Sequence, residues 1–158
     1  MNTSLFLLSA TVFVQLLASC QTTAPVTATQ PATAATTPPA ELRNTRWVLR
    51  SLHNRAITTP TNGEAYLLLR NEEQQAEGNA GCNRFGGSFS LPKAGALQFG
   101  PLRSTRMACL SEQDNTTEQG FLTVLAATRT YQISGDTLRL YAENTTQPGA
   151  VLHAVYLH

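Results

Sequence analysis

The sequence predicts a small α+β domain, mainly β, in which a strongly curved antiparallel sheet or partial barrel packs against one helix. Three observations lead to this prediction: short segments with apolar residues at alternate positions, turn residues between them, and one segment with helical spacing. Period-two runs of four to eight residues at close spacing are typical of antiparallel strands. The chain has 158 residues, enough for one domain once a targeting segment is removed.

Alternating segments follow one another from residue 42 onward. In the first of them, Trp47 and Leu49 are expected on one face of a strand and Leu52 on the opposite face. The later segments are marked by Tyr66 with Leu68, Phe85 to Leu91, Leu97 with Phe99, Tyr131 with Ile133, Leu138 with Leu140, and Val151 to Leu157. The dipeptide Gly135-Asp136 lies between two of these segments and favours a two-residue hairpin turn.

One helix is expected within this series of strands. Ser111 with Asp114 three residues later resembles a capping box, in which a side chain satisfies a backbone N–H group of the first turn. The apolar residues between Phe121 and Leu125 have helical spacing, which predicts a face packed on the sheet. Gly120 lies inside the segment and costs up to ~1 kcal/mol in a helix, so the helix depends on tertiary packing.

The first 40 residues differ in composition from the remainder. No Asp, Glu, Lys or Arg occurs from Asn2 to Ala40. The apolar run from Leu5 to Leu17 has the length of a signal-peptide core and is shorter than the ~20 residues that cross a bilayer as a helix. The segment Leu17-Ala18-Ser19-Cys20 follows, and it resembles the lipobox of bacterial lipoproteins.

This resemblance implies that residues 1–19 are a signal peptide, cleaved before Cys20, and that acyl chains on Cys20 hold the protein on a membrane. Gln21 stands where such proteins have Asp when they are retained in the inner membrane. In a Gram-negative cell we therefore expect the periplasmic face of the outer membrane. Residues 2–4 lack the usual Lys or Arg, and a plain secretory peptide with a coincidental cysteine is the alternative.

Residues 20–41 are predicted to form a disordered tether, and residues 42–158 the folded domain. The tether is rich in Thr, Ala and Pro and has almost no large apolar side chain. Without such side chains to bury, a segment cannot offset the entropy lost on ordering. Twenty residues of this kind reach about 60 Å when fully stretched.

Several local motifs occur together and in a fixed order in the domain. They are Trp47-Val48-Leu49, residues 78–87 with Gly-Cys-Asn, residues 99–109 with Ser-Thr-Arg-Met-Ala-Cys, residues 131–135, and Leu138-Arg139-Leu140. In these motifs residues 42–157 resemble the META domain (HslJ-like) family. The resemblance implies a small, barrel-like α+β domain of bacterial envelope proteins. It implies no enzyme activity, and it links the chain to envelope stress and antibiotic tolerance.

The cysteine count agrees with this picture. The chain has three cysteines, and lipidation of Cys20 leaves Cys82 and Cys109. Export places these two in an oxidising compartment, where disulfides persist, so we expect one bridge between them. Such a bridge stabilises by ~3–4 kcal/mol in the chain-entropy model. Two free buried thiols are the alternative.

The sequence carries no constellation that supports catalysis, a cofactor or a metal. Ser90-Leu91-Pro92-Lys93 matches S-x-x-K, but that pairing needs a helical turn, and Pro92 and Gly95 predict a hairpin. The three histidines, His53, His153 and His158, share no ligand spacing with the cysteines, so we expect no metal site. A net charge of +1 also argues against a nucleic-acid partner.

Two hypotheses remain for the function. Arg103, Thr105 and Arg106 form the candidate contact surface, with an ordinary solvated surface as the alternative. Asn83 is expected to be structural, in left-handed geometry and bonded to its own backbone. The leading hypothesis is a lipid-tethered, non-enzymatic module that binds an envelope protein or a small ligand. The alternative is an inhibitor of a cell-wall hydrolase such as lysozyme, and an enzyme is the third hypothesis.

Overall fold

The computed structural model describes residues 38–58 and 63–156. The expected signal peptide, Cys20 and all but the end of the expected tether lie outside the described residues. The elements, in chain order, are β1 (Arg46–Leu52), β2 (Arg55–Ala56), β3 (Tyr66–Leu69), β4 (Gln75–Asn79), β5 (Arg84–Ser90), β6 (Gln98–Phe99), β7 (Arg103–Ser104), α1 (Glu112–Ala127), β8 (Thr128–Ser134), β9 (Thr137–Ala142) and β10 (Ala150–Val155).

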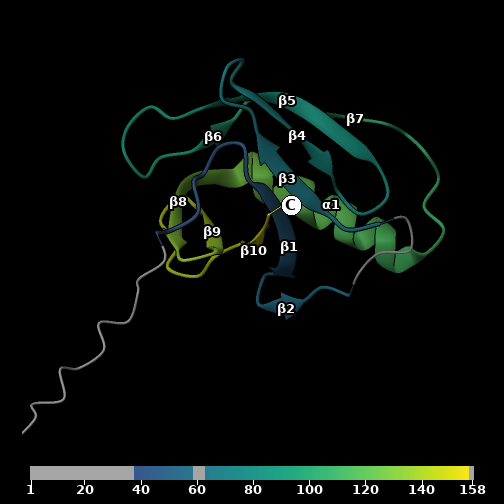
Figure 1. Cartoon of the computed structure of the whole chain (residues 1–158). Coiled ribbons are helices and arrows are strands. Elements are labelled where there is room, and N and C mark those ends of the chain that lie inside the picture. Colours follow the sequence, from purple (N-terminus) through teal and green to yellow (C-terminus); the bar gives the residue numbers. More distant parts are fainter. Residues whose placement is uncertain (1–37, 59–62, 157–158) are drawn as a thin grey trace, which may run out of the picture. The chain divides into compact units, whose positions relative to one another are not determined.

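The strands form one antiparallel sheet that curves almost into a barrel (Figure 1). Its order is β6-β5-β4-β3-β1-β10-β9-β8, with β2 also pairing with β1 and β7 with β5. The two ends of this order meet where Leu97 N donates to Arg129 O at 3.1 Å and Tyr131 N donates to Gly95 O at 3.0 Å. The partial barrel predicted from the sequence is therefore confirmed, with a seam between residues 95–97 and β8.

Helix α1 begins as predicted. The hydroxyl of Ser111 accepts a hydrogen bond from Asp114 N at 3.0 Å, which caps the first turn. Phe121, Val124 and Leu125 are buried, because this face of the helix packs on the barrel. Within the described residues, no helix is long and apolar enough to cross a membrane.

The core is one cluster of buried side chains that includes the tryptophan of β1. Trp47 has no exposed surface, and its indole Nε1 donates to Leu42 O at 2.9 Å. Ala40 also packs in this cluster, and its N–H donates to Gly135 O of the β8–β9 turn at 3.0 Å. The folded part therefore reaches back to Ala40, two residues into the segment expected to be tether.

The predicted orientation of Leu52 in β1 is wrong. Leu52 packs in the same core cluster as Trp47 and Leu49, not on the opposite face. The pairing of β1 with β10 shifts register between Leu49 and Ser51. A bulge adds one residue to a strand and so reverses the alternation beyond it. Leu52 consequently points to the core.

Candidate functional site

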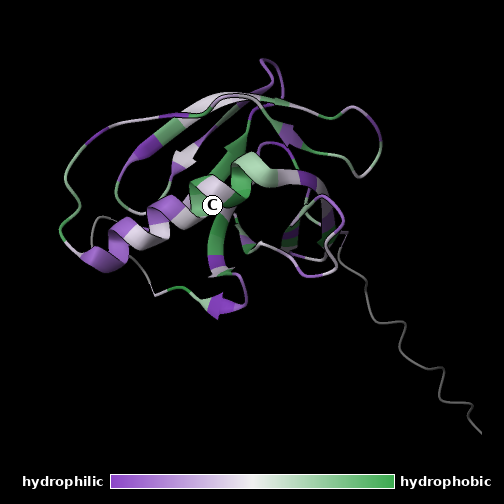
Figure 2. Ribbon diagram, turned by 180° about the vertical axis from the view of Figure 1, so that it is seen from behind, coloured by the Kyte–Doolittle hydropathy of each residue, from purple (hydrophilic) through white to green (hydrophobic). Residues whose placement is uncertain are grey.

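An exposed loop joins β7 to α1 at one end of the helix. It comprises residues 105–110, and we call it the tip loop; Figure 2 shows a hydrophobic stretch in this part of the chain. Met107 is 59% exposed and Leu110 is 74% exposed. Among the described residues, the large hydrophobic side chains that are exposed are these two and Tyr156. Two apolar side chains within four residues of one loop mark a candidate contact site.

The side chain of Asn83 holds the tip loop in place through hydrogen bonds. Its side chain is almost fully buried, at 3% exposure. Its Oδ1 accepts hydrogen bonds from the Thr105 hydroxyl at 2.7 Å and from Met107 N at 2.8 Å. Its Nδ2 donates to Met107 O at 3.1 Å. One amide side chain therefore fixes the backbone next to the exposed Met107.

The same asparagine also bonds to the helix. Asn83 N donates to Glu118 Oε2 at 2.7 Å, and Asn83 Nδ2 donates to both carboxylate oxygens at 3.1 Å. Glu118 is buried, with 9% exposure. Asn83 is thus structural, as predicted, but not for the predicted reason. Its φ is not positive, whereas that of Gly81 is, so the glycine supplies the left-handed geometry of this turn.

A covalent bond adds to these contacts. Cys82 and Cys109 form a disulfide with a Cα–Cα separation of 5.5 Å. Cys82 belongs to the turn between β4 and β5, and Cys109 lies two residues before the helix cap at Ser111. The bridge therefore attaches the end of the tip loop to the sheet, next to the hydrogen bonds of Asn83.

The three residues predicted as a contact surface have different roles. Arg103, Thr105 and Arg106 are all exposed. Thr105, however, is held by two hydrogen bonds: its N–H donates to Arg84 O at 3.0 Å and its hydroxyl donates to Asn83 Oδ1. The ion pairs found among the described residues involve Arg46, Arg50 and Arg70. Neither Arg103 nor Arg106 takes part in them, so both charges face solvent.

Two surface hollows flank the tip loop. One, of about 660 Å³, is lined by residues that include Asn83, Arg106, Cys109 and Glu118. The other, of about 540 Å³, is lined by Asn79, Cys82, Arg84, Thr105, Met107, Ala108 and Leu110. Because both hollows share residues of the loop, the loop is a ridge between them.

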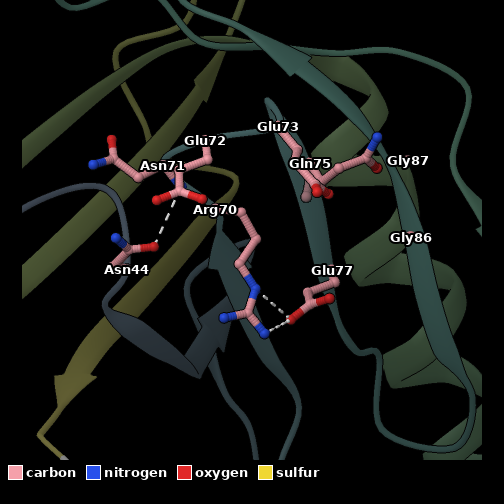
Figure 3. A pocket seen from close by; sticks show the side chains of 10 residues that line it. Asn44, Arg70, Asn71, Glu72, Glu73, Gln75, Glu77, Gly86 and Gly87 are labelled. Carbon is pink, nitrogen blue, oxygen red and sulfur yellow. Dashed lines mark hydrogen bonds and ion pairs between the residues drawn. The ribbon is translucent and has the colours of Figure 1, made fainter.

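Another hollow, of about 690 Å³, lies over the β3–β4 connection (Figure 3). Two of its charged groups bond to each other: Arg70 Nε donates to Glu77 Oε1 at 2.9 Å. Elsewhere, Ser90 ends β5 and Lys93 follows in a loop, so these two are not on one helical turn. His53 and His153 are exposed, and His158 lies outside the described residues.

The sequence did not point to the residues that matter most at this site. Met107 and Leu110 were not singled out, because an apolar residue in an irregular segment has no periodicity to interpret. Glu118 was not singled out either. A single acidic residue on the expected helix offered no signal beyond its place next to the apolar stripe.

These features together define a class: a small β-rich α+β domain, nearly closed as a barrel, that displays a loop braced by a disulfide. Residues 40–152 match the META domain, and the chain belongs to this family, which is not a known enzyme family. The resemblance to the META domain that the sequence motifs indicated is thereby confirmed.

Solved structures support the same fold. The chain is similar to a protein from Burkholderia xenovorans whose structure was solved by NMR, with 27% identity, a TM-score of 0.57, and coverage of 81% of this chain and 98% of that one. A second protein solved by NMR has 25% identity, a TM-score of 0.55, and coverage of 72% and 89%. A search of curated proteins found no match.

Proposed function

We propose that this protein is a lipid-anchored protein of the cell envelope whose META domain acts by contact, through the tip loop, and not by catalysis. One observation carries the proposal: the loop exposes Met107 and Leu110 while Asn83 and the Cys82–Cys109 bridge hold its backbone. A loop that is already ordered loses less conformational entropy on binding than a flexible one.

The chemistry of the loop indicates the kind of partner. Methionine and arginine are enriched in the buried centres of protein interfaces. Here two apolar side chains share the tip loop with Arg106, and Arg103 lies in the strand that leads into it. Neither arginine takes part in the ion pairs found among the described residues. We infer that the partner is an envelope protein whose binding site is an apolar pocket with acidic side chains at its edge.

The position of the loop agrees with a tethered mode of action. Ala40, near the start of the described chain, is bonded to the β8–β9 turn, and β8 follows the carboxyl end of α1. The tip loop precedes the amino end of the same helix, whose 16 residues span about 24 Å. The loop and the entry of the chain are therefore at different ends of the domain, as Figures 1 and 2 both show.

Photocrosslinking in living cells tests the contact. A photoreactive residue at position 107 or 110 should give discrete adducts, whereas the same residue at the exposed His153 of β10 should not. With the captured partner purified, Met107→Ser combined with Leu110→Ser should weaken binding at least tenfold. These exposed changes should leave stability within about 0.5 kcal/mol. Equal adducts at position 153 would contradict the proposal.

The hydrolase-inhibitor alternative has one observation in its favour, the exposed and unpaired charge of Arg106. A basic side chain on a ridge suits a cleft lined by carboxylates. In that case lysozyme should lose activity in proportion to added domain, and Arg106→Ala should relieve the inhibition. Full activity at an excess of domain, alongside adducts at position 107, supports contact with another envelope protein.

The membrane anchor is a separate prediction, which rests on Leu17 to Cys20. Cys20→Ala should leave the precursor uncleaved and stop its labelling by a fatty-acid analogue, because the thiol is the group that takes the lipid. Immunoblotting gives the size of the precursor, and in-gel fluorescence gives the label. Cys82→Ala in the same cells is the matched control and should still be labelled. Labelling of the Cys20→Ala protein would contradict the anchor.

A further inference from the structure

Three groups able to bind a metal lie together beneath the tip loop. The sulfur atoms of Cys82 and Cys109 and a carboxylate oxygen of Glu118 all lie within 4.8 Å of one another. They come from three parts of the chain: the β4–β5 turn, the segment before the helix, and the helix itself. We propose that, once the disulfide is reduced, these three side chains bind one thiophilic divalent cation of the Zn²⁺ type.

The set of donor atoms suits this cation. Zinc is borderline-soft, binds thiolates at about 2.3 Å and also accepts carboxylate oxygens, in tetrahedral geometry. Two sulfurs on one tetrahedral zinc are about 3.8 Å apart, so reduction needs them to separate by less than about 2 Å. Three protein ligands leave a fourth position open. The hollow lined by Asn83, Cys109 and Glu118 gives water and metal access to it.

Glu118 is a buried carboxylate whose hydrogen-bond donors are neutral groups. It accepts N–H groups from Asn83 at both of its carboxylate oxygens. None of the ion pairs found among the described residues includes it. Burying a carboxylate away from a cation is costly. Its Oε2 lies 4.0 Å from Cys109 Sγ, so a cation between them would compensate the charge.

Asn83 would orient the ligands. Its Nδ2 donates to Glu118 and also lies 3.5 Å from Cys82 Sγ. Hydrogen bonds of this kind fix the direction of metal ligands, and losing them typically lowers metal affinity by about 10–100-fold. The asparagine that holds the tip loop therefore touches two of the three ligands as well.

The chemistry requires a reductant. Two electrons and two protons convert the bridge to two thiols; a dithiol supplies them in the cell and becomes a disulfide. In vitro a phosphine supplies the electrons and becomes a phosphine oxide, with its oxygen from water. The cation then displaces both thiol protons to solvent. It would link Cys82 to Cys109 in place of the covalent bond, independently of what the tip loop contacts.

Cobalt(II) is a spectroscopic probe for this site. The full chain with Cys20→Ala, which removes the third thiol, is reduced by a phosphine without oxygen and titrated with Co²⁺. We expect thiolate charge-transfer bands and tetrahedral ligand-field bands that saturate at one ion per chain and are displaced by Zn²⁺. The oxidised protein should give neither. Absence of these bands from the reduced protein would overturn the proposal.

Substitutions distinguish the proposed metal ligands from neighbouring residues that do not bind the metal. Glu118→Gln should weaken Zn²⁺ binding at least tenfold, and Cys82→Ser should abolish the cobalt bands. Glu112→Gln is the matched control, because this exposed glutamate is on the same helix and lines the same hollow. Equal affinities for Glu118→Gln and the unsubstituted chain would refute the role of Glu118.

Loss of the fold on reduction would not hide the result. The fluorescence of Trp47, the single tryptophan and a fully buried one, reports folding at each step. If the reduced protein unfolds without metal, one equivalent of Zn²⁺ should restore the emission of the buried indole, because metal binding then drives folding. A reduced chain that stays unfolded with Zn²⁺ would count against the site.

Discussion

Replacing Asn83 with alanine should lower the free energy of unfolding by about 3–5 kcal/mol, because it takes hydrogen-bond partners from the buried Glu118 carboxylate and from several groups of the tip loop at once. Met107 N and the Thr105 hydroxyl lose their acceptor, and Met107 O loses a donor. Glu118 would keep the backbone N–H of residue 83 but lose the side-chain donor. A charged group with too few partners is the costliest of these losses.

Urea denaturation followed by Trp47 fluorescence measures this loss. The control is Asn115→Ala, at an exposed position of α1 that lines the same hollow as Asn83. A surface change of this kind should stay within about 0.5 kcal/mol. Asn83→Asp should be at least as damaging as the alanine, since it brings a second carboxylate against Glu118. A loss below 1 kcal/mol for Asn83→Ala would mean that the network does not brace the loop.

The parts of the fold that depend on local pattern were predictable. Most of the strands follow from period-two spacing, although β2, β4 and β7 were not among the predicted segments. The helix start follows from Ser111 with Asp114, and the β8–β9 hairpin from Gly135-Asp136. In each of these cases neighbouring residues supply the physical cause. The face of Leu52 was not predictable, because the bulge in β1 exists only through its register with β10, which is distant in sequence.

The candidate site shows the same division. Its covalent part followed from counting, since the predicted lipidation of Cys20 would leave a single possible pair. The bond between Asn83 and Glu118 joins residues 35 positions apart, and neither residue has a neighbour that indicates the other. The exposure of Met107 and Leu110 was also hidden. In an irregular segment, the sequence does not distinguish an apolar side chain that is buried from one that is exposed to solvent.

The disulfide is the other feature whose loss should have a large effect. Cys82→Ser and Cys109→Ser should each destabilise the protein by about 2–5 kcal/mol. The bridge closes a loop with a sequence separation of 27 residues, so in the chain-entropy model its loss frees the unfolded chain. Because both substitutions remove the same bond, their effects should be similar in size, and the double variant should be no less stable than the weaker single one.

Unfolding in urea with a metal chelator present measures the free energy of unfolding of the two single variants and the double variant. The chelator removes any contribution from bound cations. Cys82 is more buried than Cys109, so a serine hydroxyl at position 82 adds a desolvation cost, and Cys82→Ala and Cys109→Ala serve to remove that difference. Thiol titration of the native exported protein should find no free thiol at either position. Additive losses in the double variant, or a thiol that titrates without reduction, would show that the bridge is not formed in the cell. The tip loop would then be held by hydrogen bonds alone, those of Asn83 and the one from Thr105 N to Arg84 O.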